Sequence, residues 1–594
     1  MSWFIKIRDE MLKREDPVTP CEVSTDLRAL LDVVFSHDLV DDCLARIEVL
    51  IAARRCKQPS VPRGWVDQTD VILITYGDTI ADGVRPTLEV LRDFLSTYVS
   101  GYINNIHILP CFPWSSDDGF SIIDYRDICP EFGQWTHIVQ ISEDFGVMLD
   151  AVINHVSSES VWFRGFQEDD PRYRDFFHVC DPTEDYSSVT RPRALPLLRC
   201  VETIAGQRHV WTTFSDDQID LNYANPDVLL EILDVLLHYA DKGARFIRLD
   251  AIGFLWKKLG TTCMHLPETH AIVKVIRYVF DRAFPDVILL TETNVPHAEN
   301  VSYFGDGKNE AHMVYQFPLP PLTLHAFYAR DARRLSKWAS SLEPTSASTT
   351  YFNFLSSHDG IGLRPAEGLL TREELSSVAA HVEANGGRVS MRTLPDGETS
   401  PYELNISFLD AISEPEDGDA CKVEKFLAAQ TILLSLVGVP GIYIHSLLGS
   451  RNDYRGLEQT GRNRSINREK LNFKSLVDTL ARSDSLRAIT FEGHKKLLAA
   501  RRERPAFHPN SRQRVVYVDP RVFSLVREGR GDRVWVLVNV SPDRLTVKVR
   551  CTDLGLRSHV RLRDVLSDHR ADASGGRIQV VLSGYAKAWF VEDV

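Results

Sequence analysis

The sequence predicts an α/β fold, a (β/α)8 TIM barrel that is followed by a C-terminal all-β domain. From Val71 onward, eight short apolar runs alternate with longer amphipathic stretches, the order of a barrel of parallel strands covered by helices. From about residue 505, short alternating strands replace this pattern. Two connections are too long to be simple loops, so we expect inserted subdomains after the third and seventh strands.

The eight strands are predicted from short apolar runs, and the helices between them from longer amphipathic stretches. A helix is expected at 86–98, because proline suits the first helical turn. Another helix is expected at 135–144. In chain order, we expect the strands at Val71–Tyr76, Asn105–Pro110, Val147–Ile153, Arg245–Leu249, Val287–Leu290, His312–Gln316, Tyr351–Leu355 and Gly441–His445.

Changes of pattern predict three domains. Residues 1–65 are charged, helical in pattern and end in a stretch rich in proline and glycine, so they form an N-terminal helical extension. Residues 66–504 form the barrel, with insertions at about 156–225 and 360–424. Residues 505–594 form the β domain. Its strands are expected at Arg533–Val540, Leu545–Arg550, Arg577–Leu582 and Ala586–Val591.

Composition limits the classes of function. The 594 residues are 44% hydrophobic and 25% charged, as in an ordinary soluble globular protein. The formal net charge of −14 argues against a nucleic-acid partner or an anionic membrane, but not against a local cationic pocket. The ten cysteines include no Cys-x-x-Cys pair, so neither a zinc site nor a disulfide framework is expected.

The chain is expected to be cytoplasmic. Its first ten residues carry charges where a signal peptide needs an apolar core. The longest apolar run, Ala428–Ile444, is broken by polar residues, glycine and proline, which favours a buried passage over a membrane span. The oligomeric state cannot be read from the sequence.

Charged residues stand at the ends of the fourth and fifth predicted strands. Arg248 and Asp250 point the same way, because side chains repeat every second residue along a strand. Glu292 stands at the tip of the next strand. A lone aspartate there is more often a cap or a surface charge. Two carboxyl groups at the ends of barrel strands, however, are the catalytic groups that glycosyl transfer requires.

Two further strand ends carry polar residues. Asp150-Ala-Val-Ile-Asn-His155 ends the third predicted strand, and His358-Asp359 follows the seventh. With the fourth and fifth strands, four segments converge on one pocket. In this order they resemble the four conserved regions of the α-amylase family of glycoside hydrolases and transglycosylases. The resemblance covers about residues 70–500.

The resemblance implies a role for each residue at these strand ends. Asp250 matches the family's nucleophile, Glu292 its acid/base and Asp359 the third carboxylate, which holds the sugar's 2- and 3-hydroxyls. Residues that orient the nucleophile and grip the sugar are matched by Arg248, His155 and His358, although either histidine alone would more often be structural.

The expected chemistry agrees with these residue types. A retaining mechanism needs the two carboxyl groups about 5–5.5 Å apart. Arg248 should keep Asp250 ionised by pairing with it. The surroundings of Glu292 should raise its pKa, so that it is protonated at neutral pH.

Four loop segments resemble the sucrose phosphorylase branch of the family: Leu109–Phe120, Arg191-Pro-Arg193, Ser400–Asn405 and Arg464–Arg468. This resemblance implies a closed site for one glucosyl unit, held by Asp117 and Phe120. It also implies an acceptor side, where phosphate and the leaving group alternate, formed by Arg193, Tyr402, Glu403 and Arg464.

A cationic acceptor side suits a phosphorylase, because the enzyme must bind a dianion and exclude water there. Arg193 and Arg464 fit that role. For Arg191, a solvated surface turn and a functional role are equally favoured. Glu403 departs from typical sucrose phosphorylases, which carry an amide at this position, and this argues against fructose as the leaving group.

Within this branch, Val189–Leu198, His209–Tyr223, Gly260–Leu266 and the N-terminal extension most resemble the glucosylglycerate phosphorylases. That resemblance implies reversible phosphorolysis of 2-O-(α-D-glucopyranosyl)-D-glycerate to α-D-glucose 1-phosphate and D-glycerate, through a β-glucosyl-enzyme. Inorganic phosphate is then a co-substrate, and no cofactor is expected. The wider family can hold calcium with a residue at the Asn154 position, but no supporting carboxylate cluster is seen, so no metal is expected.

Several alternatives remain open at this stage. The same chemistry could act on sucrose 6′-phosphate or sucrose, because the same arginines would bind a sugar phosphate. A hydrolytic α-glucosidase would use the same carboxylates without phosphate. An inactive amylase-like scaffold is the rival outside enzymes, although it would need none of the three carboxylates.

Overall fold

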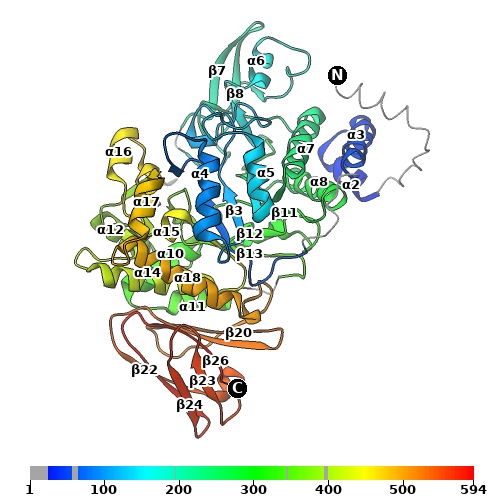
Figure 1. Ribbon diagram of the computed structural model, residues 1–594. Coiled ribbons are helices and arrows are strands. Elements are labelled where there is room, and N and C mark those ends of the chain that lie inside the picture. The colour runs from blue at the N-terminus through cyan, green and yellow to red at the C-terminus, as the bar shows by residue number, and fades with distance from the viewer. Residues whose placement is uncertain (1–24, 56–63, 194, 343–344, 394–398, 594) are drawn as a thin grey trace.

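A closed barrel of eight parallel strands lies at the centre of the computed structural model (Figure 1). The structure describes residues 25–55, 64–193, 195–342, 345–393 and 399–593. Apart from Arg245, every residue of the eight strands is buried. The strands are β1 (Ile72–Thr75), β3 (Asn105–Ile108), β4 (Gly146–Ala151), β10 (Ala244–Leu249), β11 (Ile288–Thr291), β12 (Met313–Tyr315), β13 (Thr350–Asn353) and β17 (Val439–Tyr443). The eight predicted strands are thus confirmed, except that Ile444 and His445 belong to helix α15 (Ile444–Leu447).

Amphipathic helices surround the barrel. Helix α5 (Trp135–Asp144) has the predicted bounds, and α4 (Thr87–Phe94) continues as a π-helical turn, Leu95–Val99. The other long helices are α7 (Pro226–Asp241), α8 (Pro267–Ala283), α10 (Leu319–Ala329), α11 (Arg333–Ser340), α14 (Asp419–Ser435) and α18 (Leu486–Arg502). Shorter ones are α9 (His297–Val301), α16 (Tyr454–Thr460) and α17 (Phe473–Leu480). The described chain contains no helix long and apolar enough to cross a membrane.

Both long connections carry secondary structure of their own. The connection after β4 holds α6 (Val161–Gln167), the pair β5 (His155–Ser157) and β9 (Gln218–Asp220), and a sheet of β6 (Val179–Cys180), β7 (Leu198–Thr203) and β8 (Gly206–Trp211). Figure 1 shows β7, β8 and α6 projecting beyond one end of the barrel. The connection after β13 holds β14 (Ile361–Gly362), β15 (Arg388–Thr393), β16 (Thr399–Asn405), α12 (Arg372–Ala384) and α13 (Phe408–Ala411).

Helices α2 (Thr25–Val34) and α3 (His37–Arg55) lie beside α7 and α8 (Figure 1). The Arg54 guanidinium of α3 is 2.7 Å from Asp234 and 3.4 Å from Asp241, both on α7. Residues 1–24 and 56–63 of the predicted extension lie outside the described residues. The domain limits given above stay predictions.

The C-terminal region is an antiparallel eight-stranded sheet. The four predicted strands are confirmed as β21 (Asp532–Asn539), β22 (Leu545–Arg550), β25 (Arg577–Leu582) and β26 (Lys587–Glu592). The sequence reading missed β19 (Arg512–Val515), β20 (Val522–Gly529), β23 (Arg561–Asp564) and β24 (Arg570–Ser574). Strand β23, Arg-Leu-Arg-Asp, has only one apolar residue, so its sequence resembles that of a polar loop.

Candidate active site

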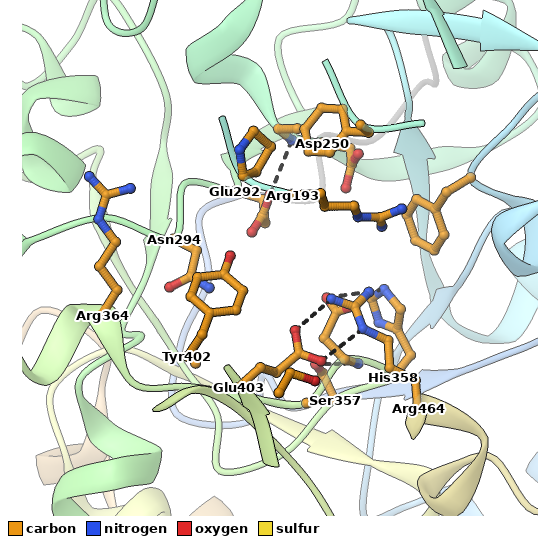
Figure 2. Close-up of a pocket in the computed structure, with 18 of the residues that line it drawn as sticks. Arg193, Asp250, Glu292, Asn294, Ser357, His358, Arg364, Tyr402, Glu403 and Arg464 are labelled. Atoms are coloured by element: carbon orange, nitrogen blue, oxygen red, sulfur yellow. Dashed lines mark hydrogen bonds and ion pairs between the residues drawn. The ribbon is translucent and has the colours of Figure 1, made fainter. Parts of the chain in front are cut away.

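A cavity of about 890 Å³ opens beyond the carboxyl ends of the barrel strands. Its wall is formed by the loops after the strands and by both inserted segments. The structure brings all of the predicted site residues to this cavity: Asp117, Phe120, His155, Arg193, Arg248, Asp250, Glu292, His358, Asp359, Tyr402, Glu403 and Arg464. Figure 2 shows the labelled members of this set turned toward one another.

Arg248 is the central cation of the site. It is almost fully buried near the end of β10, and its guanidinium donates hydrogen bonds to Asp150 and, at 2.6 Å, to Asp250. Its Nε also donates to the Tyr315 hydroxyl at 3.1 Å. Asp150 is fully buried and also pairs with the imidazole of His107 at 2.7 Å. Burial acts to raise the pKa of Asp150, but His107 and Arg248 outweigh it and lower that pKa to about 2.

The two predicted catalytic carboxyl groups share this guanidinium. Asp250 directly follows β10 and Glu292 directly follows β11. Arg248 lies 2.6 Å from Asp250 and 4.0 Å from Glu292. The Ala251 amide also donates to Glu292 at 3.1 Å, from a left-handed backbone conformation (φ +48°).

Burial raises the pKa of both carboxyl groups. For Glu292 it outweighs the opposing effect of Arg248, and with the nearby charge of Asp250 it raises the pKa to about 7. The predicted rise for Glu292 is therefore confirmed. For Asp250, burial also outweighs Arg248, so its pKa lies above the ordinary value; pairing with Arg248 only limits that rise. Because Arg248 lies 2.6 Å from Asp250 but 4.0 Å from Glu292, the site favours ionised Asp250 beside protonated Glu292.

A pair of stacked rings lines the same cavity as Asp250 and Glu292. The rings of Phe120 and His358 stack with centroids 5.0 Å apart and planes 2° from parallel. The His155 ring donates to the Phe120 backbone carbonyl at 2.9 Å. Burial lowers the pKa of both histidines, to about 3 for His358, so both are neutral donors and acceptors at pH 7.

The third predicted carboxylate, Asp359, is held by Arg464. One Arg464 nitrogen lies 2.5 Å from Asp359, and two others contact Glu403 at 2.7 and 3.0 Å (Figure 2). Burial acts to raise the pKa of Asp359, but Arg464 and His358 together keep it well below its ordinary value. Arg464 is therefore already paired with two carboxylates within the protein.

Arg193 is paired in a similar way. Its guanidinium lies 2.9 Å from Asp117, and its carbon is 5.9 Å from the centroid of the Phe214 ring. Asp117 takes a left-handed conformation (φ +55°), which turns its side chain toward the cavity. The neighbouring Gly119 (φ +105°) has no room for a side chain, because a Cβ there would stand 2.7 Å from the Pro110 carbonyl.

Comparison with known proteins places this site in a family. Residues 98–362 match the model of the alpha amylase catalytic domain. The chain is 45% identical to a glucosylglycerate phosphorylase of Spirochaeta thermophila over 581 residues, which cover 95% of this chain and 98% of that one. The chain belongs to the glucosylglycerate phosphorylase branch of the α-amylase family.

More distant relatives lie in the neighbouring branches of this family. A sucrose phosphorylase of Streptococcus mutans is 28% identical, over 69% of this chain and 84% of its own. The crystal structure of sucrose 6F-phosphate phosphorylase from Thermoanaerobacter thermosaccharolyticum has a TM-score of 0.69 and 25% sequence identity, over 80% of this chain and 94% of that one. The resemblances drawn from the sequence, to the family and to the branch, are confirmed.

Several residues of the cavity wall were not singled out from the sequence. Arg468 donates to Asp118 and, at 2.8 Å, to the His358 carbonyl, which fixes the loop that carries Asp359. Asn294 and Arg364 also line the cavity. Arg364 lies five residues beyond Asp359, which placed it near the site, but nothing in the sequence says which arginines are paired.

The ammonium group of a buried lysine lies next to Asn154. Lys257 Nζ is 2.9 Å from Asn154 Oδ1 and 2.6 Å from Asp220, and it also donates to the Phe254 carbonyl. The Lys257 side chain is only 3% exposed and Asp220 is fully buried. In the described part of the chain, no three His, Cys, Asp or Glu side chains are grouped so as to hold a metal ion.

Proposed function

We propose that this protein catalyses the reversible phosphorolysis of 2-O-(α-D-glucopyranosyl)-D-glycerate to α-D-glucose 1-phosphate and D-glycerate. One observation carries the proposal: the likeness, over nearly the whole chain, to relatives named glucosylglycerate phosphorylase. The arrangement of Asp250, Glu292 and Arg248 supports the retaining mechanism that this reaction needs.

The first half of the reaction transfers the glucosyl group to the enzyme. Asp250 attacks the anomeric carbon while the bond from that carbon to the glycerate oxygen breaks. Glu292 gives its proton to this oxygen. Its pKa of about 7 supports that step, because about half of the enzyme carries the proton at neutral pH. D-Glycerate leaves, and a β-glucosyl ester of Asp250 remains.

In the second half, phosphate takes the place of glycerate. A phosphate oxygen attacks the anomeric carbon and the ester bond to Asp250 breaks, so the two inversions give α-D-glucose 1-phosphate. The Glu292 carboxylate accepts the proton that the hydrogen phosphate ion carries, which restores its acid form for the next turnover. Glu292 then has less work as a base than it would have with water.

Sugar hydroxyls are bound by carboxylates that are already neutralised. Asp117 and Asp359 keep free acceptor capacity, while Arg193 and Arg464 balance their charge. The stacked pair of Phe120 and His358 forms an apolar wall that keeps water from one side of the glucosyl unit. Glucose is thus held through its own hydroxyls, and the proposal includes no organic cofactor.

A panel of leaving groups tests this proposal. With glucose 1-phosphate as donor, phosphate release is measured with D-glycerate, fructose, fructose 6-phosphate and glycerol. We expect kcat/KM to be highest for D-glycerate, by at least about tenfold over the neutral acceptors fructose and glycerol, because a carboxylate gains charge-assisted hydrogen bonds that a neutral acceptor lacks. Faster release with fructose 6-phosphate or fructose would contradict the glycerate assignment. Equal release without any acceptor would indicate a hydrolase, and no release with any of them an inactive scaffold.

A further inference from the structure

Most arginines at the cavity are already paired with carboxylates of the protein. Within the described residues, six of the lining arginines lie against an aspartate or a glutamate, whereas Arg191 and Arg364 have no such partner. The six are Arg193, Arg248, Arg392, Arg462, Arg464 and Arg468. A guanidinium shared with protein carboxylates has less charge and fewer N–H groups to offer an anionic ligand.

Arg364 is the better placed of the two remaining cations. Arg191 is exposed, so water screens its charge. Arg364 is half-buried, in a 3-10 turn (Arg364–Ala366) of the loop that also carries Asp359. Its side chain makes no hydrogen bond or ion pair with any described residue. It is close enough to Tyr402 and His265 to oppose the burial-driven rise in the pKa of Tyr402 and to add to the burial-driven fall in that of His265.

Two further unused donors line the same cavity as Arg364. The Asn294 amide nitrogen and the Tyr402 hydroxyl line the cavity and have no hydrogen-bond partner among the described residues. Gly362 leaves room for this arrangement, because a Cβ there would stand 2.7 Å from Asn294 Nδ2. In the view of Figure 2, Glu292 lies next to Asp250, Asn294 and Tyr402 come after it, and Arg364 is farthest from Asp250.

We propose that Arg364 binds the carboxylate of the D-glycerate leaving group, while the Asn294 amide and the Tyr402 hydroxyl donate hydrogen bonds to its oxygens. This inference rests on the proposed function and assigns its acceptor specificity to a residue. The planar guanidinium matches a carboxylate with two parallel hydrogen bonds.

The position of Arg364 favours the glycerate carboxylate over phosphate. The oxygen that leaves is on C2 of glycerate, so the carboxylate is held one bond further from the anomeric carbon. The other oxygens of an attacking phosphate lie two bonds from the oxygen at the anomeric carbon, whereas the carboxylate oxygens of glycerate lie three bonds from the leaving oxygen. In Figure 2, Arg364 is drawn farther from Asp250 than Asn294 and Tyr402 are, so it suits the group that extends further from the anomeric carbon.

Acceptor kinetics of Arg364→Gln test the inference. Glucose 1-phosphate is the donor, and the acceptors are D-glycerate and glycerol, which differ only in that a hydroxymethyl group replaces the carboxylate. We expect kcat/KM for D-glycerate to fall about 30- to 100-fold, mainly through KM. We expect acceptor-free hydrolysis of glucose 1-phosphate, the rate with glycerol and the KM for phosphate to stay within about threefold. Arg364→Lys should retain part of the wild-type kcat/KM for D-glycerate, because lysine keeps the positive charge but lacks the two parallel N–H donors of arginine.

Arg191→Gln is the matched control, an exposed arginine on the same rim, and it should keep its kcat/KM for D-glycerate within about threefold. If the wild type and Arg364→Gln use D-glycerate equally well, this inference is wrong, and the proposed function still stands. A raised KM for phosphate with unchanged use of D-glycerate would overturn it in favour of a phosphate site. A wild-type protein that does not use D-glycerate would overturn both this inference and the proposed function.

Discussion

Arg248 touches the charged groups on which the proposed chemistry depends. It pairs with Asp150 and Asp250 and approaches Glu292, while burial removes water from all of them. Because one cation faces more than one carboxylate, it cannot hold both catalytic groups fully ionised, and the remaining proton rests on Glu292. The same cluster therefore supplies an ionised nucleophile and a protonated acid at one pH.

The pKa of Glu292 predicts the alkaline limb of the pH profile. The first half-reaction needs protonated Glu292, and each pH unit above about 7 reduces that form about tenfold. We therefore expect kcat/KM for glucosylglycerate, which reports the free enzyme and the first half-reaction, to fall above pH 7. On the acid side, it should fall as Asp250 becomes protonated, at a pH above the usual range of an aspartate.

Glu292→Gln provides the control for this profile. It should lower kcat/KM by about 10²- to 10⁴-fold and remove the alkaline limb, because no proton remains to be lost at that position. A profile that keeps its fall near pH 7 in this variant would assign the limb to another group.

At the scale of elements, one cation joins two connections of the barrel, the one after β4 and the one after β10. Lys257 follows the turn after β10, Asn154 follows β4, and Asp220 lies in β9 of the first insertion. Asp220 also accepts from the Thr213 amide and hydroxyl at 2.9 and 2.6 Å. A buried carboxylate with these contacts fixes the insertion against the end of the barrel, beside His155 of the cavity wall.

Lys257→Met should destabilise the fold strongly. It leaves the fully buried Asp220 without a counter-ion, and breaking one side of a buried ion pair lowers the free energy of unfolding by about 3 to 5 kcal/mol. Urea denaturation of the wild type and the variant measures this change. Lys258→Met is the adjacent control: its side chain is 62% exposed and 3.8 Å from Glu268, so the change should stay within about 0.5 kcal/mol. Equal losses in the two variants would show that the buried pair contributes nothing.

Strand ends could be predicted from the sequence, whereas pairings between distant segments could not. The run from Gly243 to Phe254 identifies a buried strand and the direction of Arg248 and Asp250, because alternation is a local property. The bond between Arg464 and Glu403 joins residues 61 positions apart, and the position of Arg364 has meaning only once its neighbours are known to be paired. Charge balance in the acceptor site is thus a property of the folded loops.

At the scale of the whole molecule, buried arginines join the barrel to the C-terminal sheet. Arg527 of β20 is fully buried and donates to the carbonyls of Ser435, at the end of α14, and of His508, at 2.9 and 2.7 Å. Trp589 of β26 donates to the Ser435 hydroxyl at 2.9 Å. Because α14 leads directly into β17, the last barrel strand, the sheet supports the point where the barrel closes.

Arg527→Met should therefore weaken the barrel as well as the sheet. It removes the donor of the buried Ser435 carbonyl, and leaving such a group unsatisfied lowers the free energy of unfolding by about 1 to 3 kcal/mol, whereas the His508 carbonyl keeps a hydrogen bond from the Ser511 amide at 2.8 Å. Urea denaturation followed by tryptophan fluorescence and by far-ultraviolet circular dichroism measures this change. Both signals should shift together to lower urea, since Ser435 belongs to the barrel and Arg527 to the sheet. The control, Arg544→Met, changes an exposed arginine of the same sheet region and should shift the transition by less than about 0.5 kcal/mol. Two separate transitions, in place of one, would show that the sheet unfolds on its own and that the closure of the barrel does not depend on Arg527.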